Sequence, residues 1–177
     1  MSDNARVSGE RRVSPGGAIP ASPGVYLLFL SVDRDCTVTV RGGRAFGLPA
    51  GVYAYVGSAR GPGGLAARLA RHLRQDKRRH WHLDYALEHA APRGWLCFGA
   101  ALAECQLAKL VAAIPGAIPV AGFGSSDCRC PAHLYALPSH ISLEGLADIL
   151  GRLATLASVP LPLLAATSAA DLGGADD

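Results

Sequence analysis

The chain has 177 residues, enough for one domain with a substantial core but too few for two. Charged residues make up only 18% of it, the formal net charge is +3, and the five cysteines show no regular spacing. Such cysteines argue against a disulfide framework and for a reducing compartment, so we expect a cytoplasmic protein. The N-terminal residues lack the apolar core of a secretory signal, and prolines and charges interrupt the longest apolar stretch, 141–166. Neither segment is therefore expected to enter a membrane.

The N-terminal half predicts a small antiparallel sheet. Residues 1–22 are rich in Ser, Gly, Pro and Arg and are expected to form a flexible leader. Strands are predicted at 25–30, 36–41 and 52–56, because these runs are apolar or alternate Thr with Val between turn residues. The short connections favour a three-stranded meander, and with the helices below they predict an α+β fold.

The rest of the chain alternates helical and extended patterns. Helices are predicted at 64–75, 82–88, 100–113 and 142–157, short strands at 95–98 and 134–137, a turn at 92–94, and a Pro/Ala and then acidic tail at 158–177. In the first helix a leucine recurs every fourth residue and defines a buried stripe. Arg68 and His72 border that stripe and should face the sheet, whereas Arg71 and Arg74 should point away from it.

Two tyrosines stand out because of what surrounds them. Tyr55 ends a strand and is followed by a small-residue turn and by the helix that carries Arg68 and His72, and Tyr26 lies on a separate apolar strand. A phenol can relay a proton and a guanidinium can neutralise phosphate charge, so this set suits work on a phosphodiester. Each tyrosine could instead simply fill the core, and Tyr53 shares the strand face of Tyr55 and could share its site.

Glu104 lies on the apolar face of its predicted helix, where an unpaired carboxylate would be costly to bury. One interpretation is an ion pair, for example with Arg68. The other is a single hard divalent cation, Mg²⁺ or Mn²⁺, held by this carboxylate, by water and by substrate phosphate. The metal interpretation is preferred because the carboxylate's position follows the tyrosine and arginine motif.

His80 and His82, with Asp84 nearby, look at first like a metal cluster. Side chains two residues apart on a helix diverge, so both histidines could bind one ion only if the segment were extended. We expect one of the two to reach the site, although His82 could instead be bonded within the core beside Trp81.

The cysteine-rich segment near residue 130 offers a second metal hypothesis. Cys128, Cys130 and His133 could be three zinc ligands, and the candidates for a fourth are Cys105, Cys97 and His140. The spacing matches no common zinc module, so zinc at these residues is not expected, and packed thiols with a hydrogen-bonded histidine are preferred.

Charge is unevenly distributed along the chain. Residues 60–80 hold seven Lys or Arg against one Asp, a local charge of +6, while residues 140–177 carry −4. A basic block beside the tyrosine motif favours contact with a nucleic acid, although such a run can also be a solvated helix end. The expected phosphate-binding side chains are Arg71, Arg74, Lys77, Arg78 and Arg79.

Taken in order, these motifs resemble the GIY-YIG nuclease superfamily, and most closely its small Uri-type stand-alone branch. Gly24-Val25-Tyr26 and Tyr55-Val56-Gly57 match the two signature tripeptides, while Arg68, His72 and Glu104 match the later site residues. Segments 80–85 and 122–128 look like signatures of this branch. The two tyrosines lie farther apart than is usual for the family, and the asparagine that closes its site has no clear counterpart.

The resemblance implies a metal-dependent endonuclease that hydrolyses DNA phosphodiesters, in repair or processing. Glu104 would hold Mg²⁺ or Mn²⁺, Tyr26 or Tyr55 would take a proton, Arg68 would stabilise the transition state and His72 would orient a tyrosine or phosphate. The nuclease domain would span 23–138, followed by a helix and a disordered acidic tail at 139–177. The alternatives are a non-catalytic DNA- or RNA-binding module on this scaffold and a cysteine–zinc interaction module.

Overall fold

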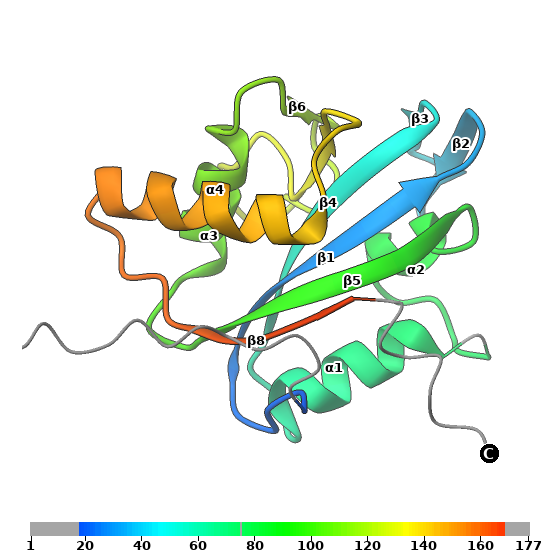
Figure 1. Cartoon of the computed structure of the whole chain (residues 1–177). Coiled ribbons are helices and arrows are strands. Elements are labelled where there is room, and N and C mark those ends of the chain that lie inside the picture. The colour runs from blue at the N-terminus through cyan, green and yellow to red at the C-terminus, as the bar shows by residue number, and fades with distance from the viewer. Residues whose placement is uncertain (1–17, 75, 169–177) are drawn as a thin grey trace, which may run out of the picture.

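The computed structural model describes residues 18–74 and 76–168 (Figure 1). Most of the expected leader and the acidic end of the expected tail lie outside these residues. Six strands form one antiparallel sheet in the order β6-β7-β4-β1-β5-β8. Their bounds are Gly24–Val32 (β1), Gly51–Ala59 (β4), Ala90–Gly99 (β5), Ile118–Pro119 (β6), Leu134–Leu137 (β7) and Leu163–Ser168 (β8). The mixed α and β class with an antiparallel sheet is confirmed, but the prediction of a small three-stranded sheet was wrong.

The strand order also differs from the predicted meander. β1 pairs with β4 on one side and β5 on the other, whereas β2 (Cys36–Thr39) and β3 (Ala45–Leu48) form a separate hairpin. β1 is buried along almost its whole length, which suits a central strand with both faces covered. The segment 92–94, predicted as a turn, lies inside β5, next to an irregularity in the β1–β5 pairing.

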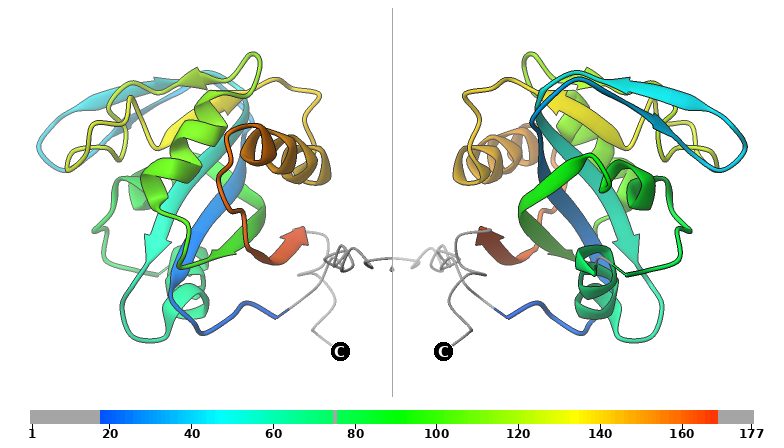
Figure 2. Two further views of the ribbon diagram at one scale, coloured as in Figure 1. Left: turned by 90° about the vertical axis from the view of Figure 1, so that its left-hand side faces the viewer. Right: turned by 90° about the vertical axis from the view of Figure 1, so that its right-hand side faces the viewer.

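Helices cover both faces of the sheet (Figures 1 and 2). α1 (Gly64–Leu73) and α2 (His82–Ala86) lie with the β2–β3 hairpin on one face, and α3 (Glu104–Ala112) and α4 (Leu143–Leu156) lie on the other. Alternate residues of β1 supply the two cores: Tyr26 and Leu28 pack toward α1, and Leu27 and Phe29 pack toward α3 and α4. None of the helices in the described part of the chain is long and apolar enough to span a bilayer.

Residues 158–177 were predicted to leave the fold, but part of this segment joins the sheet. β8 pairs antiparallel with β5 and covers its outer edge, and Ala165 is buried there. The segment is apolar without alternation, so its sequence gives no strand period. Pairing with the backbone of β5 nevertheless satisfies hydrogen-bonding groups that the edge would otherwise expose.

At one end of β4 the helices on the two faces of the sheet come close to each other. β7 pairs with β4 only over Val52–Tyr55, and the amide of Val56 then donates to the carbonyl of His133 (2.8 Å). Beyond that point the described strands leave this side of β4 unpaired. Side chains from both faces of the sheet can therefore reach the same space.

Candidate active site

A polar cavity of about 260 Å³ lies at this open end of β4. It contains four of the five predicted catalytic side chains, and the fifth, His72, contacts Tyr26 from behind. The lining residues are Tyr26, Tyr55, Gly57, Ser58, Arg68, Trp81, His82, Glu104, Gly124, Ser126 and Asp127. The structure thus brings together residues from β1, β4, α1 and α3.

Gly57 explains how Tyr26 reaches the cavity. The two residues are opposite each other in the β1–β4 register, and a Cβ at position 57 would overlap the Tyr26 ring and hydroxyl. A side chain at position 57 would therefore force the Tyr26 ring to move. Because Gly57 has no Cβ, the Tyr26 ring can lie across β4 with its hydroxyl at the unpaired edge.

Tyr26 ends a buried chain of three polar side chains. Its hydroxyl lies 2.8 Å from Nε2 of His72, and Nδ1 of the same ring lies 3.3 Å from Oδ1 of Asp84. Burial lowers the pKa of His72 to about 4, although the neighbouring Asp84 carboxylate opposes this shift. The imidazole is therefore neutral at pH 7. With its proton on Nδ1, facing Asp84, its Nε2 accepts a hydrogen bond from Tyr26.

Asp84 holds this chain in place and was not among the predicted site residues. Its carboxylate accepts hydrogen bonds from Arg71 (3.0 and 3.2 Å) and from the amides of His80 (2.9 Å) and Trp81 (3.0 Å). Burial alone would raise its pKa, but these hydrogen bonds bring it down to about 2. The sequence signal was an acid in the first turn of a helix, where it caps backbone amides.

Tyr55 and Tyr53 lie on the same strand but have different surroundings. Tyr55 lines the cavity, with its ring centroid 6.4 Å from that of Tyr26, and burial raises its pKa above the ordinary value. Tyr53 instead donates to the carbonyl of Pro49 (2.6 Å), outside the cavity. The sharing of one site by both tyrosines, left open by the strand period, is not found.

Arg68 lies over the ring of Trp81, with 4.4 Å between the guanidinium carbon and the ring centroid. This cation–π contact holds a half-buried arginine at the cavity wall. His82 also lines the cavity, whereas His80 is exposed and packs edge-to-face against Trp81. Of the two histidines considered from the sequence, His82 is therefore the one at the site.

Glu104 reaches the cavity from the start of α3. Its Oε2 accepts from the hydroxyl of Ser58 (2.6 Å), and its Oε1 lies 3.1 Å from Nδ1 of His133. Burial raises the pKa of the carboxyl, but these two partners outweigh it and lower the pKa below the ordinary value. The partners of Glu104 are thus Ser58 and His133, and the ion pair with Arg68 considered from the sequence is not found.

A second carboxylate, Asp127, lines the same cavity together with Ser126. Each oxygen of Glu104 keeps a lone pair beyond its recorded partner. Two carboxylates and a hydroxyl in one cavity fit a hard cation such as Mg²⁺ or Mn²⁺, which prefers oxygen ligands. Ser126 and Asp127 were not predicted as site residues, because their loop has no periodic pattern that places side chains.

The cysteine-rich segment forms a second cluster next to Glu104. One ligand atom from each of four residues lies within 4.8 Å of the other three, so that the group could hold a metal ion. Its members are Cys105, Cys128, Cys130 and His133, and we call it the cysteine cluster. Of the three candidates for a fourth ligand, Cys105 is the one that joins, because the start of α3 lies against this loop.

Several members of the basic block are held by acids within the protein. Arg71 and Lys77 face Asp84 (3.0 and 3.9 Å), and Arg79 pairs with Glu88 (2.5 Å). The expectation that Arg71 is free to meet phosphate is not met, because Asp84 draws it toward α2. Arg74 and Arg78 are exposed, and their side chains have no recorded partner among residues 18–74 and 76–168.

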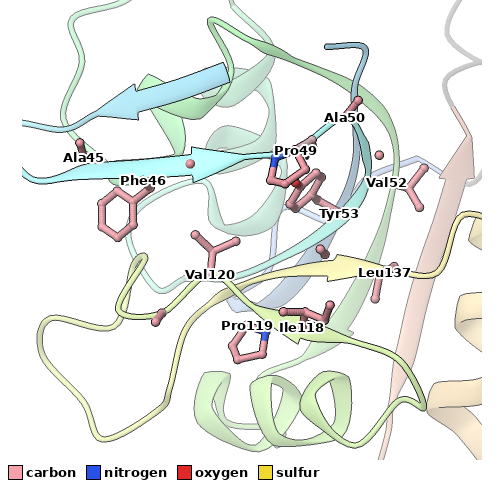
Figure 3. Close-up of a pocket in the computed structure, with 14 residues that line it drawn as sticks. Ala45, Phe46, Pro49, Ala50, Val52, Tyr53, Ile118, Pro119, Val120 and Leu137 are labelled. Atoms are coloured by element: carbon pink, nitrogen blue, oxygen red, sulfur yellow. Dashed lines mark hydrogen bonds between the residues drawn. The ribbon is translucent and has the colours of Figure 1, made fainter. Parts of the chain in front are cut away.

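A larger hollow of about 490 Å³ lies between the β3–β4 and β6–β7 segments (Figure 3). Its walls are mainly apolar, with Phe46, Val52, Val120 and Leu137 among them. The one phenol there, Tyr53, is already bonded to a carbonyl group. The hollow therefore lacks the acids, bases and cations that the smaller cavity brings together.

The chain belongs to the DUF123 family, which is described as a domain of unknown function. The family model matches residues 25–154 of the chain. No curated protein and no solved structure matches it.

Proposed function

We propose that this protein is a metal-dependent endonuclease of the GIY-YIG type, of the Uri-type branch, that hydrolyses DNA phosphodiesters in repair or processing. One observation carries the proposal. Tyr26, Tyr55, Arg68 and Glu104 come from four separate elements and from both faces of the sheet, yet they line one cavity. Burial of apolar surface by itself does not require these four polar side chains to line the same cavity.

Tyr26 is the better candidate for the general base. Burial raises its pKa, so the phenol is protonated before the reaction. Its proton has an acceptor in Nε2 of His72, and Asp84 would stabilise the imidazolium that forms. The attacking water would then give its proton to the phenolate. Tyr55 has no recorded acceptor for its own hydroxyl proton among the described residues, so we assign it to positioning.

Arg68 would stabilise the negative charge that builds up on the phosphate oxygens. It is already held at the cavity wall by Trp81, so little reorganisation is needed when the substrate binds. Glu104 and Asp127 would hold Mg²⁺ or Mn²⁺. That ion would supply charge neutralisation and an activated water.

DNA would be held mainly through its phosphates. Arg74 and Arg78 are exposed beyond the end of α1, and contacts of this kind position a duplex without reading its sequence. Arg71, Lys77 and Arg79 contribute less, since acids within the protein already neutralise them. All five cysteines are free, which supports an activity in the reducing cytoplasm.

Nicking of supercoiled plasmid with Mg²⁺ or Mn²⁺ tests the proposal. Tyr26→Phe keeps the ring and removes the hydroxyl, so the nicking rate should fall by about 100-fold or more. Tyr53→Phe is the matched control, because it removes a buried hydroxyl from the same face of the sheet but outside the cavity. Equal nicking by both variants would contradict a base role for Tyr26. DNA binding by a wild-type protein that cleaves with neither metal would favour the non-catalytic binding module instead.

A further inference from the structure

We infer that Cys105, Cys128, Cys130 and His133 form a tetrahedral zinc site with a structural role. The inference does not depend on the proposed nuclease activity. It rests on how the fold assembles four metal-binding side chains from two distant segments of the chain. Cys105 comes from the first turn of α3, and the other three come from the loop that leads into β7.

The spacing of the ligand atoms suits one small cation. Tetrahedral zinc with Zn–S bonds of about 2.3 Å and a Zn–N bond of about 2.0 Å places its ligand atoms about 3.5–3.8 Å apart. Sγ of Cys128 and Nε2 of His133 are 3.4 Å apart, and all four ligand atoms lie within 4.8 Å of one another. Side-chain rotations that move the ligand atoms by about 1 Å are enough to bring all four within bonding distance of one metal ion.

The ligand chemistry selects the class of metal. Three thiol sulfurs and one imidazole favour a thiophilic ion such as Zn²⁺, whereas Mg²⁺ and Ca²⁺ prefer oxygen. Four protein ligands also fill a tetrahedral shell and leave no position for water, which is the pattern of a structural site. The cavity cation and this zinc ion would therefore be two different metals in neighbouring sites.

His133 is oriented as a zinc ligand needs to be. Its backbone is fixed on both sides: its amide donates to Phe123 (2.8 Å), and its carbonyl accepts from Val56 (2.8 Å). Nδ1 faces the Glu104 carboxylate at 3.1 Å, so a proton on Nδ1 leaves the lone pair of Nε2 directed toward Cys128. A carboxylate behind a metal-binding histidine is the usual way in which proteins hold the ring and its tautomer.

A zinc ion at this position would also stabilise the wall of the neighbouring cavity. The loop from 120 to 133 has no helix or strand of its own, yet it carries Ser126 and Asp127 to the cavity wall. A zinc ion would fix that loop to α3 and would hold His133 against Glu104. It would therefore position both cavity carboxylates, Glu104 and Asp127, from outside the cavity.

Metal analysis of the purified protein is the direct test. Wild type should contain one zinc per chain, and its cobalt-substituted form should show the visible absorption of a tetrahedral thiolate site. Cys105→Ser and Cys130→Ser should each lose the bound zinc. Cys36→Ser is the control, since Cys36 is partly exposed, lies on the hairpin away from the cluster and should leave one zinc in place.

Folded wild type gives a second measurement in case the serine variants do not fold. Thiol alkylation followed by mass mapping should find Cys36 reactive and the three cluster cysteines protected, and a chelator should expose those three to the reagent. A zinc-free protein whose cluster thiols react as readily without chelator would overturn the inference. So would a disulfide within the cluster, or a full zinc content in Cys105→Ser.

Discussion

Two polar clusters flank the open end of β4, and they are completed in different ways. Around Asp84, a guanidinium, two backbone amides and an imidazole all contact one carboxylate, so folding alone satisfies this group. In the cysteine cluster the recorded hydrogen bonds are long sulfur contacts, at 3.4 and 3.9 Å. Thiols bond weakly, so the second cluster gains little from folding until a cation joins its ligands.

The difference also divides the chemistry of the cavity. Hydrogen bonds link Asp84 through His72 to Tyr26 and orient that hydroxyl, whereas the cysteine cluster reaches Glu104 through His133. Acid should therefore weaken the first cluster, and chelators should weaken the second.

The largest effect is expected from Glu104→Gln, which keeps the shape of the side chain but removes its charge. Nicking should fall by about 100-fold or more, because the cavity cation loses its main ligand. The zinc content should stay at one per chain, since Glu104 does not itself bind zinc. Nicking rate, melting temperature and zinc content are measured on one sample.

Glu144→Gln is the matched control for Glu104→Gln, because Glu144 is an exposed acid in the first turn of α4 and should be neutral to change. Retained nicking with a lowered melting temperature would show that Glu104 is only a structural partner of His133.

Asp84→Asn should cost the most stability of these variants, about 3 kcal/mol, because it leaves a buried network without its charge. For a chain of this length that loss lowers the melting temperature by roughly 6–12 °C. Glu88→Gln breaks the exposed pair with Arg79 and should cost under about 1 kcal/mol. Equal losses in thermal unfolding would mean that the Asp84 network adds nothing beyond a surface pair.

The buried imidazole of His72, in the same network, should make the free energy of unfolding depend on pH. The pKa of His72 is about 4 in the folded protein against 6.5 for the free side chain, so between these values the unfolded state binds more protons. The free energy of unfolding should therefore fall as the pH drops from 7 to 4, by up to about 3 kcal/mol from this group. Asp84 adds a further loss only at lower pH, between 3.8 and about 2.

Urea unfolding at pH 7 and pH 4 measures this dependence. His72→Gln has no titrating ring, so its two values should lie closer together than those of wild type. If the free energy of unfolding of His72→Gln falls as much between pH 7 and pH 4 as that of wild type, groups other than His72 cause the acid sensitivity.

The smallest effect is expected for the exposed arginines outside both clusters. Arg74→Glu combined with Arg78→Glu should weaken DNA binding several-fold and should lower the slope of log affinity against log salt by about 2. Stability should not change, because neither side chain has a recorded partner among residues 18–74 and 76–168. Arg152→Glu is the control, as this arginine is exposed on α4, over the other face of the sheet.

Fluorescence anisotropy without divalent metal, at two salt concentrations, reports this binding. Unchanged affinity in the double variant, or an equal loss in Arg152→Glu, would show that the basic block is only a solvated surface.

Local patterns in the sequence were enough to predict much of the secondary structure. Three leucines spaced four residues apart predicted α1, and β7 lies at its predicted residues, 134–137. Four of the five predicted catalytic side chains line one cavity. Tyr55 and Arg68 are joined by a short turn, whereas Tyr26 and Glu104 were predicted through the resemblance to a nuclease family. Short-range spacing and turn chemistry carry this kind of information.

Only the tertiary structure decided the order of the strands, the partners of Glu104 and the membership of the cysteine cluster. β8 joins the sheet because β5 offers it an edge, and Cys105 meets Cys128 because α3 starts beside the loop that precedes β7. The part that Asp84 plays in holding His72 was also visible only in the tertiary structure, since its partner Arg71 lies on another helix. These contacts join residues far apart in the chain, and they depend on how the whole chain buries its apolar surface, which no local pattern records.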